Sequence, residues 1–119
     1  MSEVLDLDIL RPTPKNIRLG GKEIDVSFIP CGITFEVDKI IRKMQGYDPK
    51  KLEEGGEETL SAFESTLDLC VLFCSVDNPE LDKKWFQRNT SPAQVQLMAE
   101  AIRDSLLASY NTIEAHSKN

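Results

Sequence analysis

The sequence predicts an α+β fold in which an N-terminal β-hairpin packs on a small bundle of three main α-helices plus one short helix. Two short runs that contain alternating apolar and polar residues flank Gly20-Gly21, which indicates the hairpin. Apolar residues at helical spacing recur in three later segments. With 119 residues, 40% of them hydrophobic and 29% charged, the chain can build one modest core. We therefore expect residues 1–119 to form a single domain.

The predicted hairpin spans residues 15–29. Its turn is Gly20-Gly21, because two glycines supply the positive φ angles that a two-residue hairpin turn needs. This turn pairs apolar with apolar and positive with negative side chains, namely Ile17 with Ile24 and Arg18 with Glu23. The inward-facing side chains are then Ile24, Val26 and Phe28.

Residues 1–14 are predicted to form an extended arm before the hairpin. From Val4 to Ile9, apolar side chains alternate with aspartates. This pattern is typical of a half-buried strand or of an extended segment that docks on another surface. Pro12 and Pro14 end the pattern, and the sequence leaves both interpretations open.

The first main helix is predicted over residues 34–45. Thr34 is a suitable N-cap, and the charged residues of this segment lie at the ends that the helix dipole favours. Gly46 stands where the helix should end. The apolar face is expected to consist of Val37, Ile40, Ile41 and Met44.

Residues 46–58 are predicted to form an acidic loop, because glycine and proline punctuate a run of glutamates. These carboxylates could bind a cation or a basic partner. They lack the ordered oxygen spacing of a calcium loop, however, which favours a solvated connection. The glutamates are Glu53, Glu54, Glu57 and Glu58.

The second main helix, residues 57–76, is more apolar than a single helix face can bury. Its apolar stripe widens until the C-terminal end is apolar nearly all round, through Leu69, Leu72, Phe73 and Val76. Either this end is the central helix of the domain, or part of it faces a partner chain.

Two further helices complete the predicted bundle. A short helix over residues 80–88 carries Trp85 and Phe86, which point about 100° apart on a helix and cannot both be buried in one direction. We favour a packed Trp85 over a surface aromatic that anchors a partner. The last helix spans residues 92–115, because Ser91, Pro92 and Gln94 form a strong helix start signal. Its core-facing stripe is expected to be Val95, Met98, Ala101, Ile102, Leu106 and Ile113.

The composition disfavours several function classes. Lys and Arg total 14 against 20 Asp and Glu, so the net charge is −6 and nucleic-acid binding is not expected. The longest apolar run, residues 67–76, has about half of the roughly 20 residues that a membrane span needs. Residues 1–8 lack the basic start and apolar stretch of a secretory signal, so we expect a cytoplasmic location.

Residues that could support catalysis or hold a metal are few. The single histidine, His116, lies beside a polar terminus, which leaves the usual nucleophiles without a base. An enzyme that uses carboxylates alone is therefore the least favoured hypothesis. Cys31, Cys70 and Cys74 could share a soft metal, but without a nearby fourth ligand reduced core thiols are favoured. We expect no cofactor, no metal and no enzymatic activity.

The order of these features resembles the tail assembly chaperones of long-tailed bacteriophages. The matching parts are residues 17–24 (IRLGGKEI), the amphipathic helix from Phe35, and residues 85–92 (WFQRNTSP). The resemblance implies a cytosolic phage or prophage protein that binds the helical tape measure protein and keeps it soluble until tail tube subunits replace it. It also implies self-association and absence from the finished virion.

Such a chaperone needs a spare apolar surface, and the net charge of −6 would keep its complex dispersed. We expect the partner contacts on the second main helix and on the aromatic pair, at Leu69, Leu72, Phe73, Trp85 and Phe86. The alternative hypothesis is a structural virion protein, such as a tail completion or head-tail joining subunit, in which the same surface and the arm mediate permanent assembly.

Overall fold

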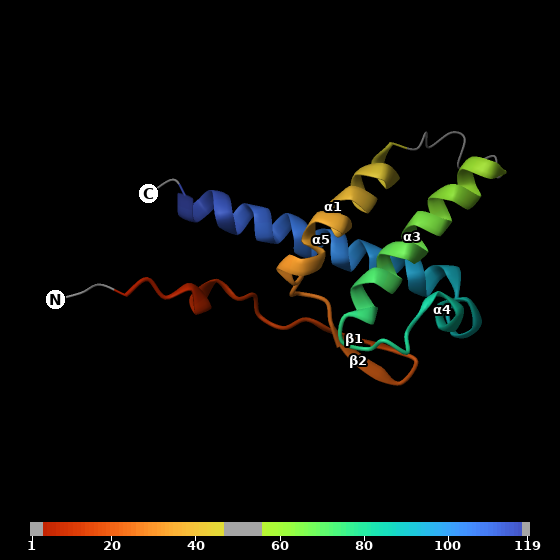
Figure 1. Ribbon diagram of the computed structural model, residues 1–119, viewed down its shortest axis with the longest axis horizontal. Coiled ribbons are helices and arrows are strands. Elements are labelled where there is room, and N and C mark those ends of the chain that lie inside the picture. The colour runs from red at the N-terminus through yellow and green to blue at the C-terminus, as the bar shows by residue number, and fades with distance from the viewer. Residues whose placement is uncertain (1–3, 47–55, 118–119) are drawn as a thin grey trace.

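The computed structural model describes residues 4–46 and 56–117 and has the predicted α+β arrangement (Figure 1). An antiparallel hairpin precedes the helices, and α3 packs against α1, α4 and α5. The elements are β1 (Asn16–Leu19), β2 (Lys22–Asp25), α1 (Cys31–Gln45), α3 (Glu57–Ser75), α4 (Lys83–Asn89) and α5 (Pro92–Ser117).

The hairpin has the predicted turn and register. Ile17 lies opposite Ile24 and Arg18 opposite Glu23, and the turn glycines have φ angles of 57° and 79°. The sheet is shorter than residues 15–29, because β2 ends at Asp25. There the Asp25 carboxylate accepts hydrogen bonds from the backbone N–H groups of Lys15 and Ser27, at 3.1 and 2.9 Å. These bonds turn the chain out of the strand direction.

This early strand end corrects one of the predicted inward residues. Ile24 and Val26 are buried as expected, but Phe28 lies beyond the strand and is half-buried. The guanidinium of Arg11 lies over the Phe28 ring, 4.1 Å from its centroid. This cation–π contact anchors the base of the arm to the body.

Helix α1 begins at Cys31, three residues before the predicted start. Pro30 is the N-cap residue, and the Thr34 hydroxyl donates to the Pro30 carbonyl at 2.9 Å rather than capping a helix of its own. The predicted end is confirmed, since Gly46 is the C-cap. Most of the predicted acidic loop, at positions 47–55, lies outside the described residues, and Glu57 is already the first residue of α3.

Side-chain capping hydrogen bonds determine where α4 and α5 begin. Helix α4 begins at Lys83 and not at residue 80, because the Asp82 carboxylate accepts from the Trp85 N–H at 2.9 Å. Helix α5 begins at Pro92 with the predicted capping box. The Ser91 N–H donates to Gln94 Oε1 at 2.7 Å, and the Gln94 N–H donates to Ser91 Oγ at 3.3 Å.

The C-terminal half of α3 is the centre of the core. Leu69 and Cys70 are fully enclosed, and Phe73 and Cys74 are buried between the neighbouring helices. The hairpin end is tied to α5, because the Ser105 hydroxyl donates to the Val26 carbonyl. Of the two interpretations of this apolar helix, the central position is therefore confirmed.

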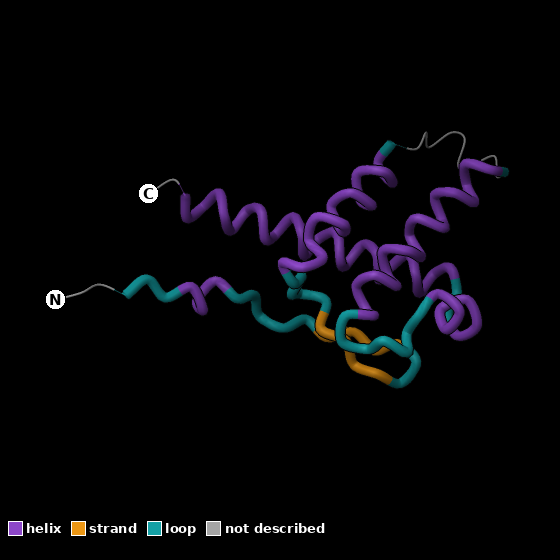
Figure 2. Tube along the Cα trace, in the orientation of Figure 1, coloured by secondary structure: helices purple, strands orange, loops and turns teal. Residues whose placement is uncertain are grey.

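The arm and the end of α5 project from the body. The radius of gyration is 16.5 Å, whereas a compact chain of 119 residues would have about 13.5 Å. Figure 2 shows the arm as loop with a single helical turn, Leu7–Leu10. The interpretation of residues 4–9 as a half-buried strand is therefore wrong, since the described sheet contains only β1 and β2 and the apolar side chains of the arm are exposed.

We predict that the hairpin turn is sensitive to the contact between Gly20 and Trp85. A Cβ at Gly20 would lie 2.7 Å from Trp85 Cζ2, whereas at Gly21 and Gly32 it would meet nothing within 4 Å. Gly21→Ala should cost about 1 kcal/mol for its positive φ, and Gly20→Ala about 1–3 kcal/mol more for the clash. Gly32→Ala, in α1, should be neutral or stabilise by up to about 1 kcal/mol. Chemical denaturation measures the series, and equal losses at Gly20 and Gly21 would contradict the contact.

Candidate functional site

The described residues hold no group of histidine, cysteine, aspartate or glutamate side chains that could bind a metal ion. The thiols of Cys70 and Cys74 instead face α5, where Cys70 Sγ lies 3.4 Å from the Val95 carbonyl oxygen. Burial raises the pKa of both thiols to about 12, and Cys74 adds to the shift of Cys70. These two cysteines are therefore protonated core residues, while Cys31 is exposed.

Three of the five predicted contact residues are buried in this chain's own core. Leu69 is 0% exposed, Phe73 7% and Phe86 1%, so none of them can reach a partner without opening the fold. Leu72 and Trp85 are half-buried and pack against the same core. The prediction of a partner surface is thus wrong at these three positions, because Leu69 and Phe73 lie on the part of α3 that α1, α4 and α5 cover, and Phe86 is the buried residue of α4.

Besides the exposed apolar side chains of the arm, one group of exposed apolar side chains lies towards the C-terminal end of α5. Leu107, Tyr110 and Ile113 are 50%, 40% and 62% exposed. We name these three residues the α5 patch. Residues three apart are neighbours on a helix surface, so the patch forms a continuous ridge. Further exposed apolar side chains are Phe35 on α1, Leu60 and Phe63 on α3, and Leu97 on α5.

The α5 patch exists because the helix is longer than the body beneath it. The stripe of α5 that begins with the buried Val95, Ile102 and Leu106 continues at helical spacing to Ile113, which is covered only in part. At 1.5 Å per residue, the 26 residues of α5 extend about 39 Å, against about 28 Å for the 19 residues of α3. The last turns of α5 therefore overhang.

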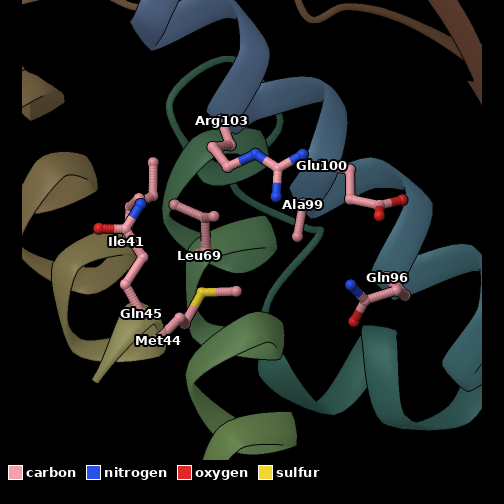
Figure 3. Close-up of a pocket in the computed structure, with 8 residues that line it drawn as sticks. All are labelled: Ile41, Met44, Gln45, Leu69, Gln96, Ala99, Glu100 and Arg103. Carbon is pink, nitrogen blue, oxygen red and sulfur yellow. The ribbon is translucent and has the colours of Figure 1, made fainter. Parts of the chain in front are cut away.

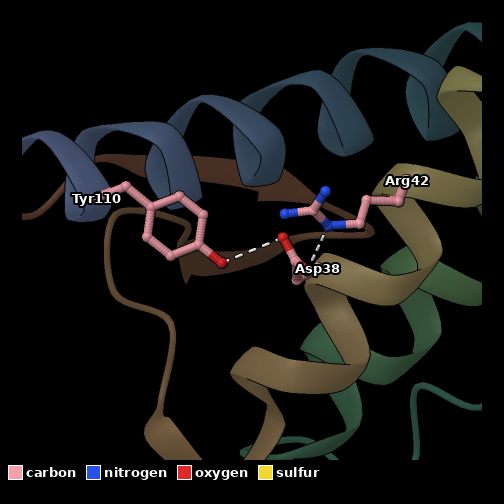
Figure 4. A network of polar contacts seen from close by, with 3 residues as sticks. All are labelled: Asp38, Arg42 and Tyr110. Atoms are coloured by element: carbon pink, nitrogen blue, oxygen red, sulfur yellow. Dashed lines mark hydrogen bonds and ion pairs between the residues drawn. The ribbon is translucent and has the colours of Figure 1, made fainter.

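A polar network fixes the direction of this overhang (Figure 4). Asp38 of α1 accepts from the Tyr110 hydroxyl at 3.1 Å and from Arg42 Nε at 2.7 Å. The hydrogen bond from Arg42 lowers the pKa of Asp38, and the Tyr110 bond lowers it further. An ionised Asp38 thus holds the start of the overhang against α1.

A separate cavity lies where α1, α3 and α5 meet (Figure 3). Its volume is about 160 Å³, and its apolar walls are formed by Ile41, Met44, Leu69 and Ala99. Its polar rim consists of Gln45, Gln96, Glu100 and Arg103. We name this hollow the three-helix cavity.

The sequence pattern missed both features for an identifiable reason. Ile113 was assigned to the core-facing stripe, since periodicity alone does not report where the supporting helices end. The length of the last helix relative to the others was the one signal that could have revealed the overhang. The three-helix cavity joins residues from three separate segments, so no local pattern could have indicated it.

No protein-family model, curated protein or solved structure matches this chain. Among residues 4–46 and 56–117, no helix combines the length and the apolar character that crossing a membrane requires. The function must therefore be inferred from the chain's own surfaces.

We predict that truncating a buried leucine of the core lowers the free energy of unfolding strongly, whereas truncating an exposed leucine of the α5 patch does not. Leu69→Ala should destabilise the protein by about 2–5 kcal/mol, because it leaves a cavity at the centre of α3. Leu107→Ala should change the free energy of unfolding by no more than about 0.5 kcal/mol. Urea denaturation measures both, and a small effect of Leu69→Ala would mean that this helix is not the packed centre.

We predict that one thiol of the three reacts in the folded protein. Cys31 is exposed, whereas the thiolates of Cys70 and Cys74 are suppressed by burial. Titration with a thiol reagent such as DTNB should show one fast group in native buffer and three in denaturant. The variant Cys31→Ser should lose the fast group, and rapid reaction of a second native thiol would contradict this assignment.

Proposed function

We propose that this protein binds another polypeptide through the α5 patch, and that it is a phage tail assembly chaperone that holds the helical tape measure protein soluble in the bacterial cytosol. The observation that carries the proposal is the overhang of α5. Its core-facing stripe continues onto turns that expose Leu107, Tyr110 and Ile113. A helix that leaves such a ridge uncovered is suited to packing against a further helix.

The strength of this contact suits reversible binding. Each of the three side chains is about half exposed, so burial on a client helix contributes roughly 1–2 kcal/mol apiece. After the cost of association, one copy alone binds weakly. Many copies along one long client act together by avidity, and the net charge of −6 keeps the coated client dispersed.

The exposed arm supports a second candidate, a structural virion protein such as a tail completion or head-tail joining subunit. Its side chains of Val4, Leu5, Leu7 and Ile9 are 62–86% exposed, which would suit permanent insertion into a neighbouring subunit. Mass spectrometry of purified phage particles separates the two functions. A chaperone is absent from the particles, whereas a joining subunit is present.

We predict that charges on the α5 patch abolish client binding without unfolding the protein. Co-expression with the tape measure protein of the same phage or prophage should keep that client soluble. The double variant Leu107→Asp/Ile113→Asp removes two apolar contacts of about 1.5 kcal/mol each and should lower affinity for a client helix about a hundredfold. The measurements are the soluble fraction of the client and the binding of a tape measure peptide.

The matched control is Leu60→Asp/Leu97→Asp, at two leucines that are 69% and 67% exposed away from the patch. The control should retain client binding, and both variants should keep the melting temperature of the unmodified chain. A client that is equally insoluble with and without this protein would refute the chaperone function. Equal losses of client binding in both variants would refute the assignment of the contact to the α5 patch.

A further inference from the structure

The arm has an apolar side that faces α5. Its helical turn, Leu7–Leu10, is a 3₁₀ turn of four residues, and side chains three residues apart on such a turn lie on the same side. The first and last residues of the turn are therefore neighbours. Both border a hollow whose opposite wall includes Ser105 and Ser109 of α5. Ile9 does not line this hollow and is 72% exposed.

The turn is held together as a unit and is fixed at its base. The Asp6 carboxylate accepts from the Asp8 N–H at 3.0 Å, and the Arg11 N–H donates to the Asp8 carbonyl at 3.1 Å. The cation–π contact of Arg11 with the Phe28 ring holds the end of the turn on the body. The turn can therefore pivot toward α5 without losing its own hydrogen bonds.

The face of α5 that borders the arm carries small side chains. An adjoining hollow between the arm and α5 extends as far as Ile113, and its α5 wall contains Ser105, Ala108 and Thr112. The Thr112 hydroxyl donates to the Ala108 carbonyl at 3.0 Å, and the Ser105 hydroxyl donates to the Ala101 carbonyl at 3.0 Å. Because these two hydroxyls already have acceptors, apolar side chains can cover them without leaving a donor unpaired.

The space between the arm and α5 is large enough to take side chains of the arm. Its two adjoining parts have volumes of about 340 and 290 Å³, whereas an apolar cavity of about 150 Å³ holds a benzene molecule. Leu7, Leu10 and Ile113 border this space and are 62%, 36% and 62% exposed. Movement of the turn into the space would remove apolar surface of all three from water. We name this space the arm hollow.

The arm itself is the occupant that the structure favours. Arg11 and Pro12 already border the arm hollow, so the turn is tethered directly beside it. A short tether gives an effective concentration on the order of millimolar, which a second copy or another protein reaches only in concentrated solution. In Figure 1 the arm and the projecting part of α5 extend from the body in the same direction, so the two can meet along their length.

We propose that the arm is a strap that closes on α5 of its own chain, packing Leu7 and Leu10 into the arm hollow against Ile113. Ile113 is also one end of the α5 patch, so the closed strap covers part of that patch and the open strap exposes all of it. The strap thus regulates access to the α5 patch. This consequence for a client rests on the proposed function, whereas closure of the strap does not.

The first experiment traps the closed strap with a disulfide. In a Cys31→Ser background, Leu10→Cys/Ile113→Cys places one thiol on the arm and one on α5, at two borders of the same hollow. A disulfide requires Cα atoms roughly 4.4–6.8 Å apart, so its rate of formation with oxidised glutathione measures closure. The expected product is an internal disulfide in a species with the mass of one copy, close to 13.4 kDa.

The matched control is Leu10→Cys/Leu107→Cys in the same background. Leu107 is 50% exposed but lies about 160° around α5 from Ser109, on the side away from the arm hollow. The control should form an internal disulfide many times more slowly. Equal rates in the two variants, no disulfide in either, or a disulfide-linked dimer as the main product of Leu10→Cys/Ile113→Cys would each overturn the proposal.

The second experiment uses the native thiol of Cys31, which is exposed and borders the arm hollow. Leu7→Asp/Leu10→Asp should hold the strap open and raise the rate of reaction with the neutral reagent N-ethylmaleimide several-fold. Leu5→Asp/Ile9→Asp adds the same charge at side chains that do not line the hollow, and it should react like the unmodified chain. Equal rates in all three proteins, or an equal rise in both variants, would overturn the proposal. Circular dichroism checks folding, and Leu10→Asp alone replaces a variant that does not fold.

Client binding separates the strap from the proposed function. The open-strap variant Leu7→Asp/Leu10→Asp should bind a tape measure peptide more tightly than the unmodified chain, because a larger fraction of its molecules exposes the whole α5 patch. The gain in affinity should not exceed the rise in the thiol reaction rate, since both depend on the open fraction. Equal affinities would overturn regulation of the patch by the strap. Expected disulfide and thiol results without any peptide binding would support closure and refute only the chaperone function.

Discussion

The constraint on which the structure depends is the burial of α3. Its C-terminal half is apolar on nearly every side, so it must be covered from several directions at once. Helices α1, α4 and α5 provide that cover, and Leu69 and Cys70 are fully enclosed between them. The same burial that stabilises the core disfavours the ionised form of Cys70 and Cys74 and raises the pKa of both thiols to about 12. The apolar residues in the C-terminal half of α3, such as Leu69 and Phe73, are thus part of the core and not a surface for binding a partner.

Covering α3 leaves part of α5 without support. Helix α5 is 26 residues long and α3 is 19, so two helices that share one core cannot share it along their whole lengths. The bonds of Asp38 with Tyr110 and Arg42 hold the first part of the overhang against α1. Beyond that point the core stripe of α5 continues to Ile113, which borders a hollow with Leu10 and Pro12 of the arm and is 62% exposed. Part of the apolar surface available for binding lies there.

Local signals predicted the elements well where the responsible interaction is short-range. The Gly20-Gly21 turn fixed the register of the hairpin, and the Ser91 and Gln94 box fixed the start of α5. The prediction was wrong where a tertiary or side-chain contact competes. Thr34 bonds back to Pro30 inside a helix that starts earlier, and Asp25 ends β2 early by accepting from Lys15, ten residues away. The candidate site was less predictable, because exposure depends on which neighbours cover a residue.

The sequence by itself determined that this is a small acidic α+β chain with one histidine and an excess of apolar residues in its middle helix. Composition and periodicity suffice for this, because they depend on residue type and spacing alone. Only the tertiary structure decided where the spare apolar surface lies. It buried Leu69, Phe73 and Phe86 and exposed Leu107 and Ile113, since burial is set by the relative lengths and positions of packed helices, which no single segment encodes.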